Sequence, residues 1–166
     1  MAQMREDYIH YSIRNYLRAQ GWLLIAGQYP DGSDDELSAL NITDPVVARD
    51  NSPDPRRHSQ NKIVPDLVCS KNNVILIIEM KPSYSEMDEK KLVYLLTERY
   101  EDMVASLQDF LSAKEIVLER SIEEYTFVPC LAFSASSRFN KRQDFCYFRV
   151  HDLHTPEFEG NASISI

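Results

Sequence analysis

Residues 62–81 read KIVPDLVCSKNNVILIIEMK, and this stretch decides the fold class. It contains two β-rich runs, 62–69 and 74–81, on either side of the turn-forming residues 70–73, a pattern that predicts a β-hairpin. The second run is apolar at five successive positions, 74–78, as in a strand that is covered on both faces. We therefore expect residues 74–81 to form a central strand of a sheet.

The rest of the chain adds helices and further strands around this hairpin. Apolar residues recur at helical spacing in a first stretch that ends at Gly21 and in a second one over about 85–113. Further strands are expected at 22–26, 125–133 and 145–150. The second helix is long enough to cross the sheet, so that residues 125–133 form a parallel strand. The order α-β-β-β-α-β-β implies an α/β domain with a mixed central sheet flanked by helices.

Length and composition limit the possible classes of protein. A chain of 166 residues can bury one sizeable core and is short for two domains, so we expect a single domain over 1–166. Residues 29–60 are rich in proline, acids and small polar residues, which predicts a long irregular loop. No apolar run approaches the ~20 residues of a membrane span, and the first residues lack a signal-peptide core. We expect a cytoplasmic protein with no membrane partner.

The charge distribution excludes one mode of nucleic-acid binding. A net charge of -8 does not suit a protein that coats nucleic acid by bulk electrostatics, because such proteins usually have a basic face. The acids are concentrated: residues 84–124 carry a net charge of -6, whereas residues 61–83 carry +1. The segments assigned to the sheet are thus neutral or slightly basic.

Two acids and a lysine on the hairpin have the pattern of a metal site for phosphodiester cleavage. A turn at 71–72, or any other loop of even length, turns Asp66, Glu79 and Lys81 to one face of the sheet, because side chains alternate between faces. The Met80 side chain points away, but its backbone carbonyl can serve the same site. Two carboxylates and a carbonyl suffice for Mg²⁺, which prefers oxygen ligands and keeps several waters. The metal activates an attacking water, and a nearby ammonium offsets charge in the transition state.

Pro65-Asp66, twelve intervening residues and Glu79-Met80-Lys81 resemble the motif of the PD-(D/E)xK nucleases. The resemblance implies a restriction-endonuclease-like fold, a three-layer α/β core that agrees with the order of elements derived above. In that family the first acid and the Glu bind the metal and the Lys assists catalysis. Asp66, Glu79 and Lys81 are therefore the expected catalytic residues. Asp66, Glu79 and the Met80 carbonyl would hold Mg²⁺, for which Mn²⁺ substitutes.

The first helix carries two further candidates. Many members of the family place an extra acidic metal ligand on this helix, and Glu6 resembles it, although an exposed first-turn acid that favours the helix dipole explains Glu6 equally well. His10 resembles the helix histidine of cap-snatching RNA endonucleases, which joins the motif residues around manganese. The extra acid that those enzymes carry ahead of the hairpin is not evident here. We therefore expect His10 to be solvated or hydrogen-bonded.

Two compact basic groups flank the motif. Arg56 and Arg57 precede the first strand of the hairpin, and Arg138, Lys141 and Arg142 precede the last predicted strand. Such groups commonly contact backbone phosphates in a nuclease, although ordinary solvated loops would explain them as well. Because the acidic helical stretch repels a polyanion, we expect a nucleic acid to approach from the hairpin side.

The resemblance implies a magnesium-dependent DNA endonuclease of restriction or defence type, with DNA preferred over RNA. The segment from the first helix to Lys81 also resembles the N-terminal nuclease region of type I restriction subunits. One alternative is a structure-selective nuclease such as a junction resolvase, and another is a cap-snatching-like RNA endonuclease. A third is a non-catalytic module with the restriction fold that binds or assembles other proteins. A homodimer or a larger nuclease complex is compatible with each of them.

Overall fold

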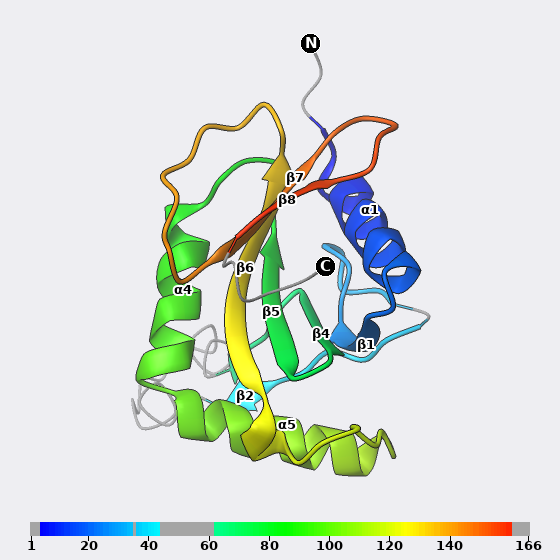
Figure 1. Ribbon diagram of the computed structural model, residues 1–166, viewed down its shortest axis with the longest axis vertical. Helices are drawn as coiled ribbons and strands as arrows, with labels where there is room; N and C mark the ends of the chain where they lie inside the picture. Colours follow the sequence, from blue (N-terminus) through cyan, green and yellow to red (C-terminus); the bar gives the residue numbers. More distant parts are fainter. Residues whose placement is uncertain (1–3, 35, 44–61, 161–166) are drawn as a thin grey trace, which may run out of the picture.

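The structure is a computed structural model that describes residues 4–34, 36–43 and 62–160. In these ranges the chain forms α-helices, one short 3₁₀-helix and strands in a mixed α/β architecture, as predicted (Figure 1). The helices are α1 (Glu6–Ala19), α4 (Glu86–Thr97), α5 (Tyr100–Ala113) and the 3₁₀-helix η1 (Ile122–Glu124). The strands are β1 (Leu23–Gly27), β2 (Ile42–Thr43), β3 (Lys62–Ile63), β4 (Leu67–Lys71), β5 (Val74–Met80), β6 (Thr126–Ser134), β7 (Cys146–Val150) and β8 (Glu157–Glu159).

The predicted hairpin is formed by β4 and β5, which pair antiparallel. Its turn is Asn72-Asn73 rather than the expected 71–72, since Lys71 pairs with Val74. Asn72 has a φ of 54°, in the left-handed region, which asparagine tolerates better than most residues. Because both turns have two residues, the side chains alternate between the faces of the hairpin as predicted.

The run expected as one strand over 62–69 is divided into β3 and β4. The division falls at Val64-Pro65-Asp66, because proline has no N–H for the ladder and restricts the residue before it. The β3 segment pairs with β2 in a separate two-stranded sheet. Asp66 therefore lies just outside the regular strand, where its carboxylate and backbone can take other partners.

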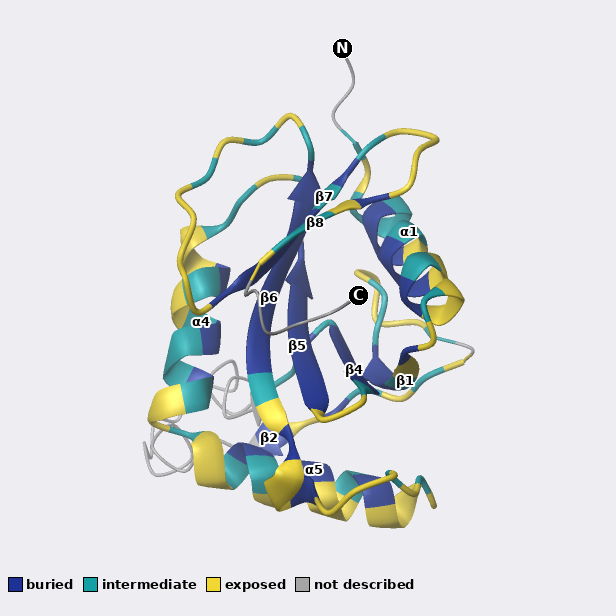
Figure 2. Ribbon diagram, viewed as in Figure 1, coloured by how far each residue is buried: buried dark blue, intermediate teal, exposed yellow. Residues whose placement is uncertain are grey.

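The main sheet has six strands in the order β1-β4-β5-β6-β7-β8. The prediction of a parallel strand after the helical segment is confirmed, since β6 pairs parallel with β5. The central position of β5 is also confirmed, and Figure 2 shows that β5 is buried along its length. The sequence did not reveal β8, a three-residue edge strand that is too short to show a pattern.

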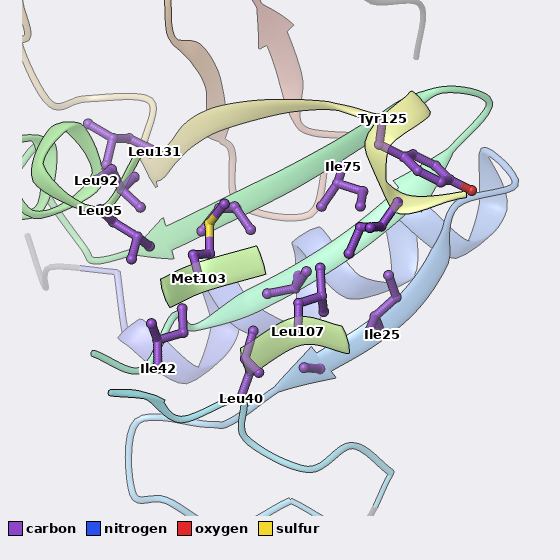
Figure 3. Packing of buried hydrophobic residues seen from close by; sticks show 14 of the residues in the cluster. Ile25, Leu40, Ile42, Ile75, Leu92, Leu95, Met103, Leu107, Tyr125 and Leu131 are labelled. Atoms are coloured by element: carbon purple, nitrogen blue, oxygen red, sulfur yellow. The ribbon is translucent and has the colours of Figure 1, made fainter. Parts of the chain in front are cut away.

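Helices cover both faces of this sheet. α1 packs on one face through Ile9, Ile13 and Leu17, while α4 and α5 pack on the other. Figure 3 shows Leu92 of α4 and Leu107 of α5 directed toward the buried residues of the strands. Within the described ranges, no helix combines the length and the apolar character that crossing a membrane requires.

The single helix predicted over 85–113 is in fact two helices. α4 ends at Thr97, α5 begins at Tyr100, and α5 runs across the lower end of the molecule in Figure 1. No glycine or proline marks the bend, so no local signal predicts it. The bend lets Met103 and Leu107 join the same buried cluster as α4, which a straight continuation of α4 would not allow.

Part of the segment predicted as an irregular loop over 29–60 is ordered and contributes to the core. Leu40 and Ile42 are 1% and 0% exposed and belong to the cluster beneath α5. Ile42 also begins β2, which contacts α5. Residues 44–60 lie outside the described residues.

Candidate functional site

Asp66 and Glu79 lie together at the end of the hairpin that is remote from its turn. Leu67 pairs with Ile78, so the next position along each strand places Asp66 opposite Glu79. Alternation then directs both side chains to the face of the sheet that α4 covers. The Met80 backbone N–H donates a hydrogen bond of 2.8 Å to Asp66 Oδ2, which holds this carboxylate against β5.

Glu79 is a buried acid with an unusual environment. The residue is 3% exposed. Burial raises its pKa well above the ordinary range, and so do the negative charge of Asp66 and a hydrogen bond between the two carboxyl groups. The positive charge of Lys91 acts in the opposite direction without cancelling these effects. A buried carboxyl group beside a second, half-buried one therefore favours the binding of a proton or a cation.

Lys81 lies beyond the end of β5 and is less enclosed than the two acids. Its side chain is 46% exposed, and its Nζ is 3.5 Å from Asp88 Oδ2. Burial alone would lower the pKa of Lys81, but the charges of Asp88, Asp66, Glu6 and Glu79 together raise it. The ammonium thus stays charged and near the acids, although its direct partner is Asp88 rather than Asp66 or Glu79.

Two residues of α4 complete the cluster, and the sequence analysis did not identify them. Lys91 Nζ is 2.5 Å from Glu79 Oε1 and donates a hydrogen bond of 3.3 Å to the Val64 carbonyl. Asp88 is buried, and burial raises its pKa, while Lys81 and Lys91 lower it. The ammonium in contact with Glu79 is therefore Lys91, not the lysine of the motif.

A local signal could have located these two residues. Ser85 caps α4, since its Oγ accepts a hydrogen bond of 3.1 Å from the Asp88 N–H. Ser-x-x-acid before an apolar run is a recognised helix start. Once the helix begins there, Asp88 and Lys91 are three residues apart on one face. The short linker after Lys81 then brings this face of α4 close to the end of β5, where Lys91 contacts Glu79.

Two residues of α1, Glu6 and His10, lie near this cluster, and their pKa values are shifted in opposite directions. Burial raises the pKa of Glu6, Lys81 lowers it, and Asp66 and Asp88 raise it further. Glu6, in the first turn of α1, therefore interacts electrostatically with residues of the cluster. His10 is 1% exposed, and neither ring nitrogen has a hydrogen-bond partner among the described residues. The expectation of a solvated or hydrogen-bonded histidine is wrong, and burial lowers the pKa of His10, which favours the neutral ring.

The predicted phosphate-binding residues fall into two groups. Arg56 and Arg57 lie outside the described residues. Arg138, Lys141 and Arg142 are exposed in the segment between β6 and β7. Acids already accompany two of them: Lys141 is 3.8 Å from a carboxylate of Glu159, and Arg142 is paired with Asp144 at 3.0 Å and Glu89 at 3.7 Å. The segment is therefore less positive than its sequence suggests.

The donors at the cluster fit a hard divalent cation. Asp66 and Glu79 supply two adjacent carboxylates, one half-buried and one buried, and a cation would relieve their repulsion. The Met80 N–H points to Asp66, and because the N–H and C=O of one strand residue face the same neighbour, its carbonyl is directed the same way. Among the described residues, no group of three or more His, Cys, Asp or Glu side chains is arranged to hold a metal. Backbone oxygens and water would have to complete the shell.

Chemically, this arrangement combines two acids that can share a cation with two ammonium groups within reach. Such a set can bind a polarising cation and stabilise negative charge on a nearby phosphate. Comparison of the chain with models of known protein families found no match, and comparison with curated proteins found none either. The function is therefore inferred from the geometry and chemistry of the site.

Proposed function

We propose that the chain is a metal-dependent nuclease of the PD-(D/E)xK type, and specifically a DNA endonuclease of the restriction or defence kind. The observation that carries the proposal is the convergence of Asp66 and Glu79 at one end of the hairpin, with Lys81 beyond them. The order of elements supports it, because α1, the antiparallel β1, β4 and β5, the helix α4 and the parallel β6 follow the family order. We propose the restriction-endonuclease-like fold on the same basis.

Each residue has a defined task in the proposed reaction. Asp66, Glu79 and the Met80 carbonyl would hold Mg²⁺, with Mn²⁺ as a substitute. When bound, the metal would supply an activated water and a polarised phosphoryl oxygen. Lys81, which is half exposed, can reach a phosphate and offset the charge that develops there. Asp88 pairs with Lys81 and orients it.

An open pocket beside the site offers room for part of a substrate. Its volume is about 430 Å³, within the range of ligand sites, and Glu6 lies in its wall. Tyr11 is 55% exposed, and its ring centroid is 5.0 Å from that of Tyr29, which also lines the pocket. Aromatic faces of this kind can stack against nucleobases. The pocket therefore suits a nucleobase better than a phosphate, because its described lining includes the acids Glu6, Asp7 and Asp31 and the single basic residue Arg5.

The test is a cleavage assay on plasmid, linear, branched and single-stranded DNA and on RNA, with Mg²⁺, Mn²⁺ or EDTA. We expect cleavage with either metal and none in EDTA. Asp66→Asn and Glu79→Gln should each lower the rate at least about 100-fold, because a metal contributes several kcal/mol of transition-state stabilisation. Glu86→Gln is the matched control, since Glu86 is an exposed acid of α4 that pairs only with Lys90 among the described residues.

The motif lysine requires a separate measurement. Lys81→Ala should reduce cleavage but leave metal binding intact, because an ammonium is not a metal ligand. Full activity in Asp66→Asn would overturn the proposed site. No cleavage of any substrate by a folded protein that binds no metal would favour the non-catalytic assembly module instead.

A further inference from the structure

The Lys91 side chain ends at the position where β4 and β5 converge. Its Nζ is 2.5 Å from Glu79 Oε1 and 3.3 Å from the Val64 carbonyl oxygen. Glu79 in turn lies opposite Asp66, since Leu67 pairs with Ile78 and these two acids come next along the paired strands. Lys91 therefore places a positive charge against one of the two acids that would hold the metal. The neighbouring Lys90, by contrast, is 76% exposed and pairs with Glu86.

The oxygen atoms around Lys91 are the kind that a hard divalent cation prefers. A carboxylate oxygen and a backbone carbonyl oxygen both bind Mg²⁺, and both also accept hydrogen bonds from an ammonium group. The Glu79 side chain is 2% exposed, so a positive charge beside its oxygens offsets the hydration that the carboxylate loses on burial. Lys91 provides that charge in the metal-free protein. A divalent cation would provide twice as much at the same oxygens.

We infer that the Lys91 ammonium occupies the cation position of the metal-free protein and withdraws when a divalent cation binds, so that metal binding exchanges one cation for another. The inference rests on the proposed metal site at Asp66 and Glu79. The Lys91 side chain is 32% exposed and has a flexible four-carbon stem, so the ammonium can move toward solvent without a shift of α4. Lys91 is in this sense a positioning residue, since it acts on Glu79 and not on the substrate.

The first measurement is metal affinity in the absence of nucleic acid. Mn²⁺ is titrated calorimetrically into the wild type, Lys91→Met and Lys90→Met. Methionine matches the lysine side chain as far as Cε and removes its charge. A metal can bind only those molecules in which Lys91 has left Glu79. The apparent affinity is therefore the intrinsic affinity multiplied by the fraction of such molecules. If Lys91 contacts Glu79 in about nine-tenths of the metal-free molecules, Lys91→Met should bind Mn²⁺ roughly tenfold more tightly than the wild type does. Lys90→Met should bind Mn²⁺ as the wild type does.

The second measurement uses the unmodified chain and does not depend on folding of a variant. Lysine acetylation with an amine-reactive reagent is followed by mass spectrometry with and without Mg²⁺. Withdrawal of the ammonium from Glu79 should make Lys91 several-fold more reactive when Mg²⁺ is added. Lys90 is the internal control, because its exposed side chain should react equally in both conditions.

The outcomes separate this inference from the proposed function. Unchanged or weaker Mn²⁺ binding by folded Lys91→Met would overturn the exchange, and so would unchanged acetylation of Lys91 in a wild type that binds metal. In that case the metal site and the nuclease proposal would both stand. If neither the wild type nor Lys91→Met binds Mn²⁺, the metal site is wrong, and the exchange is wrong with it. Asp66→Asn should abolish Mn²⁺ binding in either background.

Discussion

The protein contains two groups of charged side chains that include buried members, and they are built differently. In the first, Arg14 of α1 makes a bidentate pair with Asp34, with distances of 2.6 and 3.3 Å. Both side chains are almost fully buried, at 1% and 5% exposure. The Asp34 carboxylate also accepts hydrogen bonds from the backbone N–H groups of Glu36 and Leu37. Every charge in this group has a partner of opposite sign.

The second group, at the end of β5, has more negative than positive charges. Asp66, Glu79 and Asp88 face the ammonium groups of Lys81 and Lys91. Glu6 adds a further acid from α1, since its charge interacts with those of Lys81, Asp66 and Asp88. Acidic side chains therefore outnumber basic ones in this group, whereas the Arg14–Asp34 pair is balanced.

The pKa values of the two groups differ in the same way. Burial would raise the pKa of Asp34, but hydrogen bonds from Arg14 and the backbone outweigh burial, so this pKa lies below its ordinary range. The pKa of Glu79 lies well above its ordinary range, because burial and Asp66 together exceed the effect of Lys91. Removing one partner of a balanced buried pair leaves an uncompensated charge, whereas an acid with a raised pKa beside other acids is a candidate functional residue.

The largest effect is expected at the balanced pair. Asp34→Asn leaves the Arg14 guanidinium buried without a counter-charge, and breaking a buried pair in this way is strongly destabilising. We expect the free energy of unfolding to fall by about 3 kcal/mol, near the lower end of the range for such pairs, because Asp34 lies just below the surface. Urea denaturation followed by circular dichroism measures it. A loss below about 0.5 kcal/mol would show that the Arg14–Asp34 pair contributes no more to stability than an exposed ion pair does.

At the unbalanced group, the neutral substitution should have the opposite sign. Glu79→Gln removes a buried negative charge beside Asp66, and Lys91 can then turn toward solvent. The free energy of unfolding of the metal-free protein at neutral pH should rise, because the raised pKa of Glu79 means that its ionised form costs stability, and glutamine does not ionise. The same denaturation experiment in EDTA measures it. Destabilisation comparable with that of Asp34→Asn would show that Glu79 and Lys91 form a structural ion pair.

The pH dependence of stability distinguishes the two groups further, because the pKa of Asp34 is lowered and the pKa of Glu79 is raised. Asp34 has a lowered pKa in the folded state, so its contribution is present above the ordinary carboxylate range and is lost as the pH falls through the folded value. Glu79 has a raised pKa, so its contribution is present at acidic pH and is lost as the pH rises through the folded value. Unfolding curves in EDTA should therefore lose an acid-side slope in Asp34→Asn and a slope nearer neutrality in Glu79→Gln. Unchanged slopes in both variants would contradict the assigned shifts.

The smallest effect on stability is expected for exposed charges. The variant Arg138→Ala/Lys141→Ala/Arg142→Ala should change the free energy of unfolding by less than about 1 kcal/mol, because exposed pairs contribute little. Its effect should appear in binding of duplex DNA to the protein in EDTA, measured over a range of salt. Each lost phosphate contact reduces the log–log slope by about 0.9. Because acids already accompany Lys141 and Arg142, the total loss should be below three contacts, and an unchanged slope would exclude this segment from the binding surface.

The sequence by itself determined the hairpin, the α/β class and the common face of the two acids. Strand periodicity and turn chemistry are local, so residues 62–81 were sufficient for these conclusions even though the turn lies one residue later than expected. An even-length turn and side-chain alternation place Asp66 and Glu79 on one face whatever the rest of the chain does. That is why the motif could be located without knowledge of the helices.

Only the tertiary structure decided which positive charge meets Glu79, and where the long helical stretch bends. The bend between α4 and α5 follows from packing of Met103 and Leu107 beneath the sheet, because no local breaker marks it. The contact of Lys91 with Glu79 depends on how α4 packs against β6, which brings Lys91 to the end of the neighbouring strand β5. The sequence put Lys81 nearest to the acid in the chain, but proximity in space is a property of packing between distant segments, which local periodicity does not encode.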